Sequence, residues 1–195
     1  MHAPHVHGHR FTQVECLRSP ERVAHLEIER VADQVLTNVS AHTLLDVGTG
    51  TGLFAEAFYK RGLTVAGIDA NPKMLEMARQ YLPDAELRQA TAEKIPFPAQ
   101  AFDIVFMGLV LHEIDEILTA LQEARRVASQ RVAILEWSYR TEDFGPGLEE
   151  RIPPETMASL CRQIGFEDME TFPLEKLVLY LLPEYNKIIN MIKSC

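Results

Sequence analysis

The chain has 195 residues, of which 47% are hydrophobic and 24% charged, so it is long enough to bury the core of one domain. Its formal net charge of −9 and its sequence pI of about 5.3 argue against a broad surface that binds nucleic acid. No apolar run approaches the ~20 residues of a membrane-spanning helix, and the N-terminus has no apolar signal-peptide core. We therefore expect a cytoplasmic protein with no membrane span.

Cysteine and histidine usage does not indicate a metal centre. The three cysteines are far apart in the sequence and form neither a Cys-x-x-Cys pair nor a disulfide framework: Cys16, Cys161 and Cys195. Four histidines crowd the start of the chain: His2, His5, His7 and His9. Imidazoles bind transition metals, but no cysteine or carboxylate framework accompanies these. We read them as a polar N-terminal segment or a cloning remnant and expect no metal.

The N-terminal part of the chain predicts one amphipathic helix over residues 20–39. Ser19 is a candidate N-cap and Pro20 suits the first helical position. Apolar residues then recur at helical spacing: Ile28, Val31, Val35 and Val39. This helix either caps a ligand site or simply packs on the core. We divide the chain into residues 1–39, an N-terminal segment with a cap helix, and residues 40–195, the ligand-binding part of one compact domain.

From residue 43 onward, predicted strands alternate with predicted helices. The expected strands are 43–47, 64–69, 85–90, 102–107 and 132–136, and the expected helices cover 53–61, 72–82, 114–124 and 153–163. The late strands 166–172 and 177–182 are joined too closely for a helical crossover, so they should pair antiparallel, and 184–193 reads as a short terminal helix. The pattern predicts an α/β fold with a Rossmann-like, doubly wound, mostly parallel sheet, helices on both faces and an antiparallel C-terminal hairpin strand.

A glycine-rich turn follows the first predicted strand. The strand carries Asp46 near its end, and Gly48, Gly50 and Gly52 come next, before a helix. Glycine has no Cβ, so such a turn can adopt positive φ and let a ligand lie against the backbone. A strand, a glycine turn and a helix are typical of nucleotide-binding βα units, although a Gly-x-Gly-x-Gly string alone is weak evidence.

Asp69 ends the second predicted strand, 17 residues after Gly52. A carboxylate at this place can accept hydrogen bonds from both hydroxyls of a ribose, which favours an adenosine-type ligand. The alternative is an aspartate that caps the helix beginning near Pro72.

Four segments resemble the motifs of class I S-adenosylmethionine-dependent methyltransferases, in the same order and at similar spacing. They are residues 44–52, 65–75, 90–97 and 102–113. The last of them resembles the branch that includes quinone-biosynthesis C-methyltransferases. The resemblance implies S-adenosylmethionine as cofactor and S-adenosylhomocysteine as product.

The resemblance also implies a role for each residue of the cofactor site. Asp46 would face the positive methionine end, the three glycines would pass under methionine and ribose, and Asp69 would hold the ribose hydroxyls. The adenine would meet Ala92 and Glu93 at its edge and Ala70 and Met74 on its apolar face, while backbone near Met107 would complete the methionine side.

The acceptor side is less defined. His112 and Glu113 follow the fourth predicted strand, so His112 is a candidate general base, although a packing role at a helix entry is the competing interpretation. Glu136, Trp137 and Tyr139 follow the fifth strand and are candidates to line the acceptor pocket, or to form its rim. The segments left to shape this pocket are 1–39 and 138–152. Relatives usually carry a Pro-Gly-Gly turn before strand five, where this chain has a shortened loop at 128–130.

We therefore expect a methyltransferase that acts on a small-molecule acceptor by direct methyl displacement. A nicotinamide-dependent oxidoreductase is one alternative, but the glycine spacing departs from Gly-x-Gly-x-x-Gly and no second mononucleotide-binding half is evident. A non-catalytic S-adenosylmethionine-binding or metal-linked protein is the other. The identity of the acceptor does not follow from the sequence.

Overall fold

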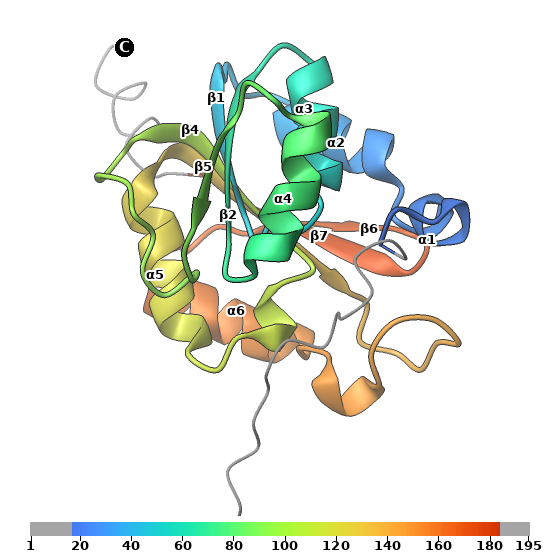
Figure 1. Cartoon of the computed structure of the whole chain (residues 1–195). Helices are drawn as coiled ribbons and strands as arrows, with labels where there is room; N and C mark the ends of the chain where they lie inside the picture. The colour runs from blue at the N-terminus through green and yellow to red at the C-terminus, as the bar shows by residue number, and fades with distance from the viewer. Residues whose placement is uncertain (1–16, 184–195) are drawn as a thin grey trace, which may run out of the picture.

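The computed structural model describes residues 17–183, and these form a seven-stranded sheet flanked by helices (Figure 1). The strand order is β3-β2-β1-β4-β5-β7-β6. The strands are β1 (Thr43–Val47), β2 (Thr64–Asp69), β3 (Glu86–Gln89), β4 (Phe102–Gly108), β5 (Ala128–Trp137), β6 (Glu170–Pro173) and β7 (Leu177–Pro183). The helices are α1 (Pro20–His25), α2 (Ile28–Leu36), α3 (Leu53–Lys60), α4 (Pro72–Tyr81), α5 (Ile117–Val127) and α6 (Pro154–Gln163), with short 3-10 helices η2 (Leu111–Glu113) and η3 (Leu148–Glu150).

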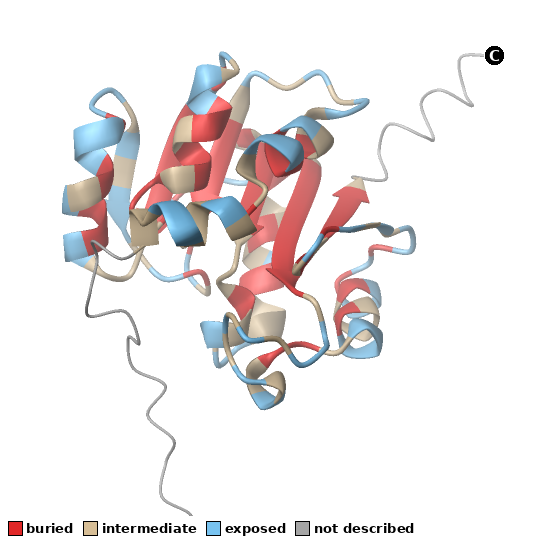
Figure 2. Cartoon of the chain, turned by 90° about the vertical axis from the view of Figure 1, so that its right-hand side faces the viewer, coloured by how far each residue is buried: buried red, intermediate tan, exposed pale blue. Residues whose placement is uncertain are grey.

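The sheet is covered on both faces. Alternate residues of the central strands belong to two separate apolar clusters: on β4, Val105 and Met107 pack with α5 and α6, whereas Ile104 and Phe106 pack with α2 and α3. Burial on both faces explains why these strands read as nearly continuous apolar runs. Figure 2 shows the same result, with the central strands buried and the outer helix surfaces exposed.

The parallel core agrees closely with the prediction. β1 and β2 have the predicted bounds, and β1, β2, β3, β4 and β5 pair parallel in the order 3-2-1-4-5. The late strands β6 and β7 pair antiparallel, as expected, and β7 also pairs antiparallel with β5. The doubly wound, mostly parallel sheet with an antiparallel C-terminal part is therefore confirmed. The predicted helix at 184–193 and the N-terminal histidines lie outside the described residues.

The prediction of one continuous helix over 20–39 was wrong. The chain forms α1 and α2 as separate helices because Glu27 adopts a left-handed conformation, with φ of 44°. The Glu27 carboxylate accepts the backbone N–H of Glu175 at 2.6 Å, and Leu26 beside it is 2% exposed. Long-range contacts, invisible to helical periodicity, thus set this break.

The prediction of a shortened loop at 128–130 was also wrong, because β5 begins at Ala128 directly after α5. Ala128 pairs with Phe102, and an irregularity in the ladder follows before Ile104. Further along β5, the buried Arg131 guanidinium donates to the carbonyls of Val35 and Thr37. The long β5 therefore anchors the end of α2.

Neither a membrane span nor a metal cluster appears within residues 17–183. No helix there is long and apolar enough to cross a bilayer. No group of three or more histidine, cysteine or carboxylate side chains within the same range is arranged to hold a metal ion.

Candidate active site

The carboxyl ends of β1, β2, β4 and β5 meet at one edge of the sheet, since these strands run parallel. Ligands of open α/β sheets bind at this edge, near the point where the strand order reverses. Here that point lies between β1 and β4. The glycine turn follows β1, Asp69 ends β2, His112 follows β4 and Glu136 lies near the end of β5.

The glycine turn is held tightly to its neighbours. Gly48 and Thr49 both donate their backbone N–H to the carbonyl of Ile68 at 2.9 Å. Gly48 has φ of +70°, and a Cβ there would lie 2.4 Å from Cγ2 of Val110. Gly50 has φ of +53°, but a Cβ there would meet nothing within 4 Å. The turn therefore packs against the β4 side at Gly48 and faces open space at Gly50, where a ligand can approach the backbone.

Asp69 joins the turn to β2. Its carboxylate accepts the backbone N–H of Gly50 at 2.8 Å and that of Asn71 at 2.8 Å. The cap of α4 is a different residue, because the Asn71 side chain accepts the N–H of Lys73. A carboxylate has about four acceptor positions and can serve several donors at once. The second role proposed for Asp69, as the helix cap, is thus filled by Asn71.

Asp46 is a buried acid directly beneath the turn. It is 2% exposed, and the Thr49 hydroxyl donates to it at 2.8 Å. Burial raises the pKa of Asp46 to about 7; the Thr49 hydrogen bond opposes this rise, and the charge of Asp69 adds to it. A positive group beside these two carboxylates would favour their ionised forms.

The remaining residues predicted to contact the cofactor differ in how much side chain they present. Ala70 is half-buried, and its carbonyl accepts the side-chain amide of Gln89 at 3.0 Å. Met74 and Ala92 are nearly buried, and Glu93 is half-buried. Met107 is fully buried, which leaves only its backbone for a ligand.

His112 and Glu136 form a buried pair across the ends of β4 and β5. The His112 ring nitrogen Nδ1 lies 2.9 Å from Oε2 and 3.1 Å from Oε1 of Glu136. Glu136 also accepts the backbone N–H of His112 at 3.3 Å and that of Trp137 at 3.2 Å. Their side chains are 8% and 2% exposed. The sequence indicated each residue separately but not their contact, since 24 residues separate them.

Other charges act on this pair. Burial lowers the pKa of His112, and so does the charge of Arg22. The charge and hydrogen bond of Glu136, together with the charge of Glu113, outweigh these effects, so the pKa of His112 lies above its ordinary value. Burial also raises the pKa of Glu113, and among the nearby charges His112 and Arg22 lower it while Glu136 and Asp69 raise it. Glu113 is thus within electrostatic reach of both the glycine-turn side and the His112 side of the edge.

The segment 138–152 is organised around Arg151, a residue that the sequence analysis missed. Arg151 is 4% exposed and donates to the carbonyls of Ser138, Arg140, Phe144 and Pro146. Trp137, 2% exposed, packs against Phe144 and lies under Gly145, where a Cβ would approach its ring to 2.8 Å. Trp137 is therefore the base of this segment, whereas Tyr139 is 45% exposed.

The N-terminal segment reaches the glycine turn through Arg18, another residue that was not predicted. Its guanidinium donates to the Thr51 carbonyl at 2.8 Å and to Glu56 at 2.7 Å, and it stacks over the Tyr81 ring at 3.4 Å. On the other side, His25 of α1 lies against Phe144, with ring centroids 4.7 Å apart. Residues 17–25 therefore connect the turn with the 138–152 segment.

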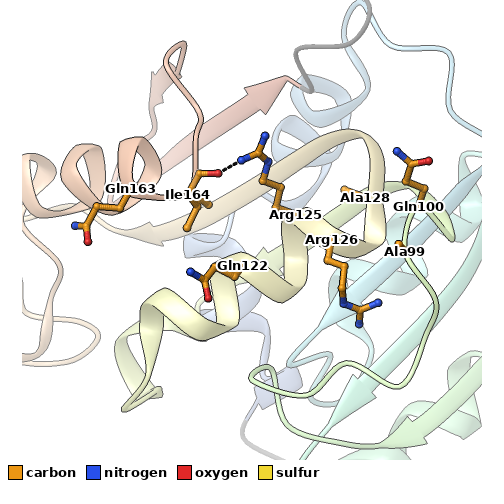
Figure 3. A pocket seen from close by; sticks show the side chains of 8 residues that line it. All are labelled: Ala99, Gln100, Gln122, Arg125, Arg126, Ala128, Gln163 and Ile164. Carbon is orange, nitrogen blue, oxygen red and sulfur yellow. Dashed lines mark hydrogen bonds between the residues drawn. The ribbon is translucent and has the colours of Figure 1, made fainter.

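A separate cavity of about 510 Å³ lies far from these residues, at the amino ends of β4 and β5 (Figure 3). Its lining includes Gln100, Ala128 and two arginines of α5. Arg126 is bound to Glu123 and to the carbonyls of Phe97 and Ile95. The cavity is thus at the opposite end of the strands from the ligand edge.

Comparison with known proteins decides the class. A family model described as "Methyltransferase domain" matches residues 45–134. The demethylmenaquinone methyltransferase of Chlorobaculum parvum is 28% identical over 173 residues, covering 71% of this chain and 72% of its own. The malonyl-[acyl-carrier protein] O-methyltransferase of Serratia marcescens is 35% identical over 108 residues, covering 54% of this chain and 42% of its own. This chain is a class I S-adenosylmethionine-dependent methyltransferase.

The fold of the methyltransferase agrees with this assignment. A crystal structure of a SAM-dependent methyltransferase from Aquifex aeolicus superimposes with a TM-score of 0.75 at 24% identity, covering 87% of this chain and 96% of that one. The comparisons favour a methyltransferase over the oxidoreductase and the non-catalytic alternatives. The cofactor is S-adenosylmethionine, with S-adenosylhomocysteine as product.

The chemistry of the edge fits this cofactor. Two carboxylates, Asp46 and Asp69, lie beside the glycine turn, and the backbone at Gly50 faces open space. Without a counter-charge, Asp46 titrates near neutral pH because of its burial. A positive amino group or sulfonium would supply that charge.

Proposed function

We propose that this methyltransferase transfers the methyl group to a small-molecule acceptor bound between η2, α1 and the 138–152 segment. The observation that carries the proposal is the placement of two groups of side chains along one sheet edge. The glycine turn, Asp46 and Asp69 lie on the β1 and β2 side, and His112, Glu113 and Glu136 lie on the β4 and β5 side.

The cofactor site is proposed to consist of residues from each loop at this edge. Its members are Asp46, Gly48, Gly50, Gly52, Asp69, Ala70, Met74, Ala92, Glu93 and Met107. Asp46 balances the positive end, the Asp69 carboxylate accepts the ribose hydroxyls, and the bare backbone at Gly50 allows close approach. S-adenosylmethionine supplies an electrophilic methyl carbon on a sulfonium when bound.

On the acceptor side, this chain orients the nucleophile and excludes water. Holding the acceptor atom in line with the methyl carbon provides much of the rate advantage in such a displacement. His112 is the candidate to accept a proton from the acceptor, because it lies on the acceptor side of the edge. Arg151 orders the 138–152 segment, so the acceptor site has a defined wall.

The choice of a small-molecule acceptor is supported by the named relatives and by the acidic charge of −9. Those relatives are named for a quinone precursor and for a malonyl group on a carrier protein. The N-terminal segment and the 138–152 segment are the parts of the chain that we propose to enclose this acceptor.

Calorimetry followed by an acceptor screen tests the proposal. We expect S-adenosylhomocysteine to bind the wild-type protein with one-to-one stoichiometry, and radioactive methyl groups to appear on a phenolic, quinol or carboxylate acceptor. Asp69→Ala should weaken binding about 10- to 100-fold, whereas Glu123→Gln, which removes a partner of Arg126 in the lining of the distant cavity, should retain it. Tight binding with methylation only of nucleic acid would contradict the acceptor class, and no binding would contradict the cofactor site.

A further inference from the structure

We propose that Glu136 is a positioning residue that fixes the His112 ring so that its Nε2 atom removes a proton from the acceptor. This inference rests on the proposed function. It assigns the acceptor to a chemical class: a nucleophile that is protonated at neutral pH, such as a phenol, a hydroquinone or an enol, and not a carboxylate.

The hydrogen bonds determine the tautomer of the ring. A carboxylate has no proton to donate, so the short contacts from Nδ1 to both oxygens of Glu136 require Nδ1 to be the donor. The neutral His112 ring then carries its acceptor lone pair on Nε2. Glu136 cannot swing away easily, because the backbone N–H groups of His112 and Trp137 also hold it.

The position of Nε2 suits contact with an acceptor. Its nearest charged neighbour is Glu113, whose Oε1 lies 3.8 Å away, beyond hydrogen-bond distance. His112 is two residues after Val110, and Val110 touches the glycine turn at Gly48. The imidazole is therefore carried two residues along the chain from the contact between Val110 and the glycine turn.

A buried pair with only a packing role is the competing explanation. Buried ionic pairs contribute little net stability compared with apolar replacements, so packing alone does not account for one at the ligand edge. The charged or titratable groups that face the pair are Glu113 on η2, Arg22 on α1 and Tyr180 on β7. Burial, the charge of Glu136 and Cys161 raise the pKa of Tyr180 to about 12, so this phenol stays neutral near physiological pH.

The acceptor O–H bond breaks and its proton moves to Nε2 of His112, which becomes an imidazolium paired with Glu136. The electron pair left on oxygen, or on the conjugated carbon of an enol or a hydroquinone, forms the new bond to the methyl carbon. The S–CH₃ bonding pair stays on sulfur, and the proton later leaves His112 to solvent.

The same step explains why the acceptor class follows. A carboxylate is already ionised at neutral pH and needs no base, whereas a phenol or an enol needs one. The two relatives differ in this respect. One is named for demethylmenaquinone, and the other for a malonyl group, which carries a carboxylate. The His112–Glu136 pair favours for this chain an acceptor that must lose a proton, and not a carboxylate.

The test measures the titration of His112 by NMR in full-length protein with S-adenosylhomocysteine bound. In wild-type protein we expect His112 to titrate above its ordinary range, and Glu136→Gln should shift its titration to lower pH because the opposite charge is lost. Glu123→Gln, which removes a carboxylate bound to Arg126 of the distant cavity, should leave the His112 titration in place. An unchanged His112 titration in Glu136→Gln would overturn the positioning role.

The pH dependence of kcat is a second test of the proposal. For a phenolic acceptor, Glu136→Gln should lower kcat by about 10- to 100-fold and move the rising limb of its pH profile to lower pH, with little change in KM. If that variant does not fold, His112→Gln should lower kcat about 100-fold while binding S-adenosylhomocysteine as wild type does. An unchanged kcat in His112→Gln, or a carboxylate as the best acceptor, would overturn the inference while cofactor binding leaves the methyltransferase assignment intact.

Discussion

Asp46→Asn should stabilise the protein without ligand at neutral and alkaline pH. Burial raises the pKa of Asp46 from 3.8 to about 7. Each pH unit of such a shift corresponds to about 1.4 kcal/mol, so the ionised side chain costs the folded state about 4 kcal/mol above pH 7. An asparagine oxygen can still accept the hydrogen bond from Thr49. A buried amide with incomplete hydrogen bonding destabilises the folded state by about 1–3 kcal/mol, which reduces this gain. We expect a net gain of roughly 1–3 kcal/mol at pH 8.

The sign of the pH dependence is opposite to that of most acids. Between pH 4 and 7 the folded state of the wild type binds more protons at Asp46 than the unfolded state does, so its stability falls as pH rises. Urea unfolding at several pH values, without cofactor, measures this slope. Asp46→Asn should remove that part of the slope and, in calorimetry, should weaken S-adenosylmethionine binding about 10- to 100-fold, because a charged hydrogen-bond partner is lost.

Asp103→Asn is the matched control. Partial burial disfavours its ionised form, but hydrogen bonds from His42, Gln130 and Thr43 outweigh burial and lower the pKa of Asp103. Its contribution is therefore present at neutral pH and is lost on acidification, so this variant should be less stable at pH 7. If Asp46→Asn is no more stable than wild type at pH 8 and keeps the same slope, the assignment of a strained buried charge is refuted.

Three further substitutions test the geometry of the site. Gly48→Ala should cost about 1–3 kcal/mol of unfolding free energy, because its Cβ would lie 2.4 Å from Cγ2 and 2.8 Å from Cβ of Val110, at a φ of +70°. Urea unfolding measures this loss, and a variant as stable as wild type would contradict the clash. Asp69→Ala should weaken S-adenosylhomocysteine binding about 10- to 100-fold in calorimetry, and unchanged affinity would rule out its contact with the ribose. Arg151→Ala should leave the affinity for S-adenosylhomocysteine intact but destabilise the protein by roughly 2–4 kcal/mol. It should also remove the hydrogen-exchange protection of residues 138–152. Retained protection would show that other contacts order this segment.

The fold could be predicted well from the sequence wherever local pattern and burial agree. β1 and β2 end at the predicted residues because each is a short apolar run closed by an acid or a glycine turn. α4 begins where Asn71 and Pro72 predict it, since both signals act within one turn of the chain. The glycine turn and Asp69 could be placed at one edge because parallel strands bring their carboxyl ends together.

What could not be predicted depends on contacts between distant residues. The break at Glu27 serves a hydrogen bond to residue 175, and the start of β5 at Ala128 depends on its pairing with Phe102. His112 and Glu136 were each noted as residues beyond a strand, but their contact arises only when β4 and β5 align. Arg151 carries no local signal, because its four partners are backbone carbonyls whose positions depend on the loop that it orders.

The order of the strands has a consequence for synthesis of the chain. β7 lies between β5 and β6, and its residues Leu177 and Val178 pair with Trp137 and Glu136. A growing polypeptide therefore exposes one side of β5 as an unpaired edge until almost all of residues 17–183 have left the ribosome. Unpaired edges are templates for aggregation, so a nascent chain that stalls before β7 should be a preferred client of chaperones.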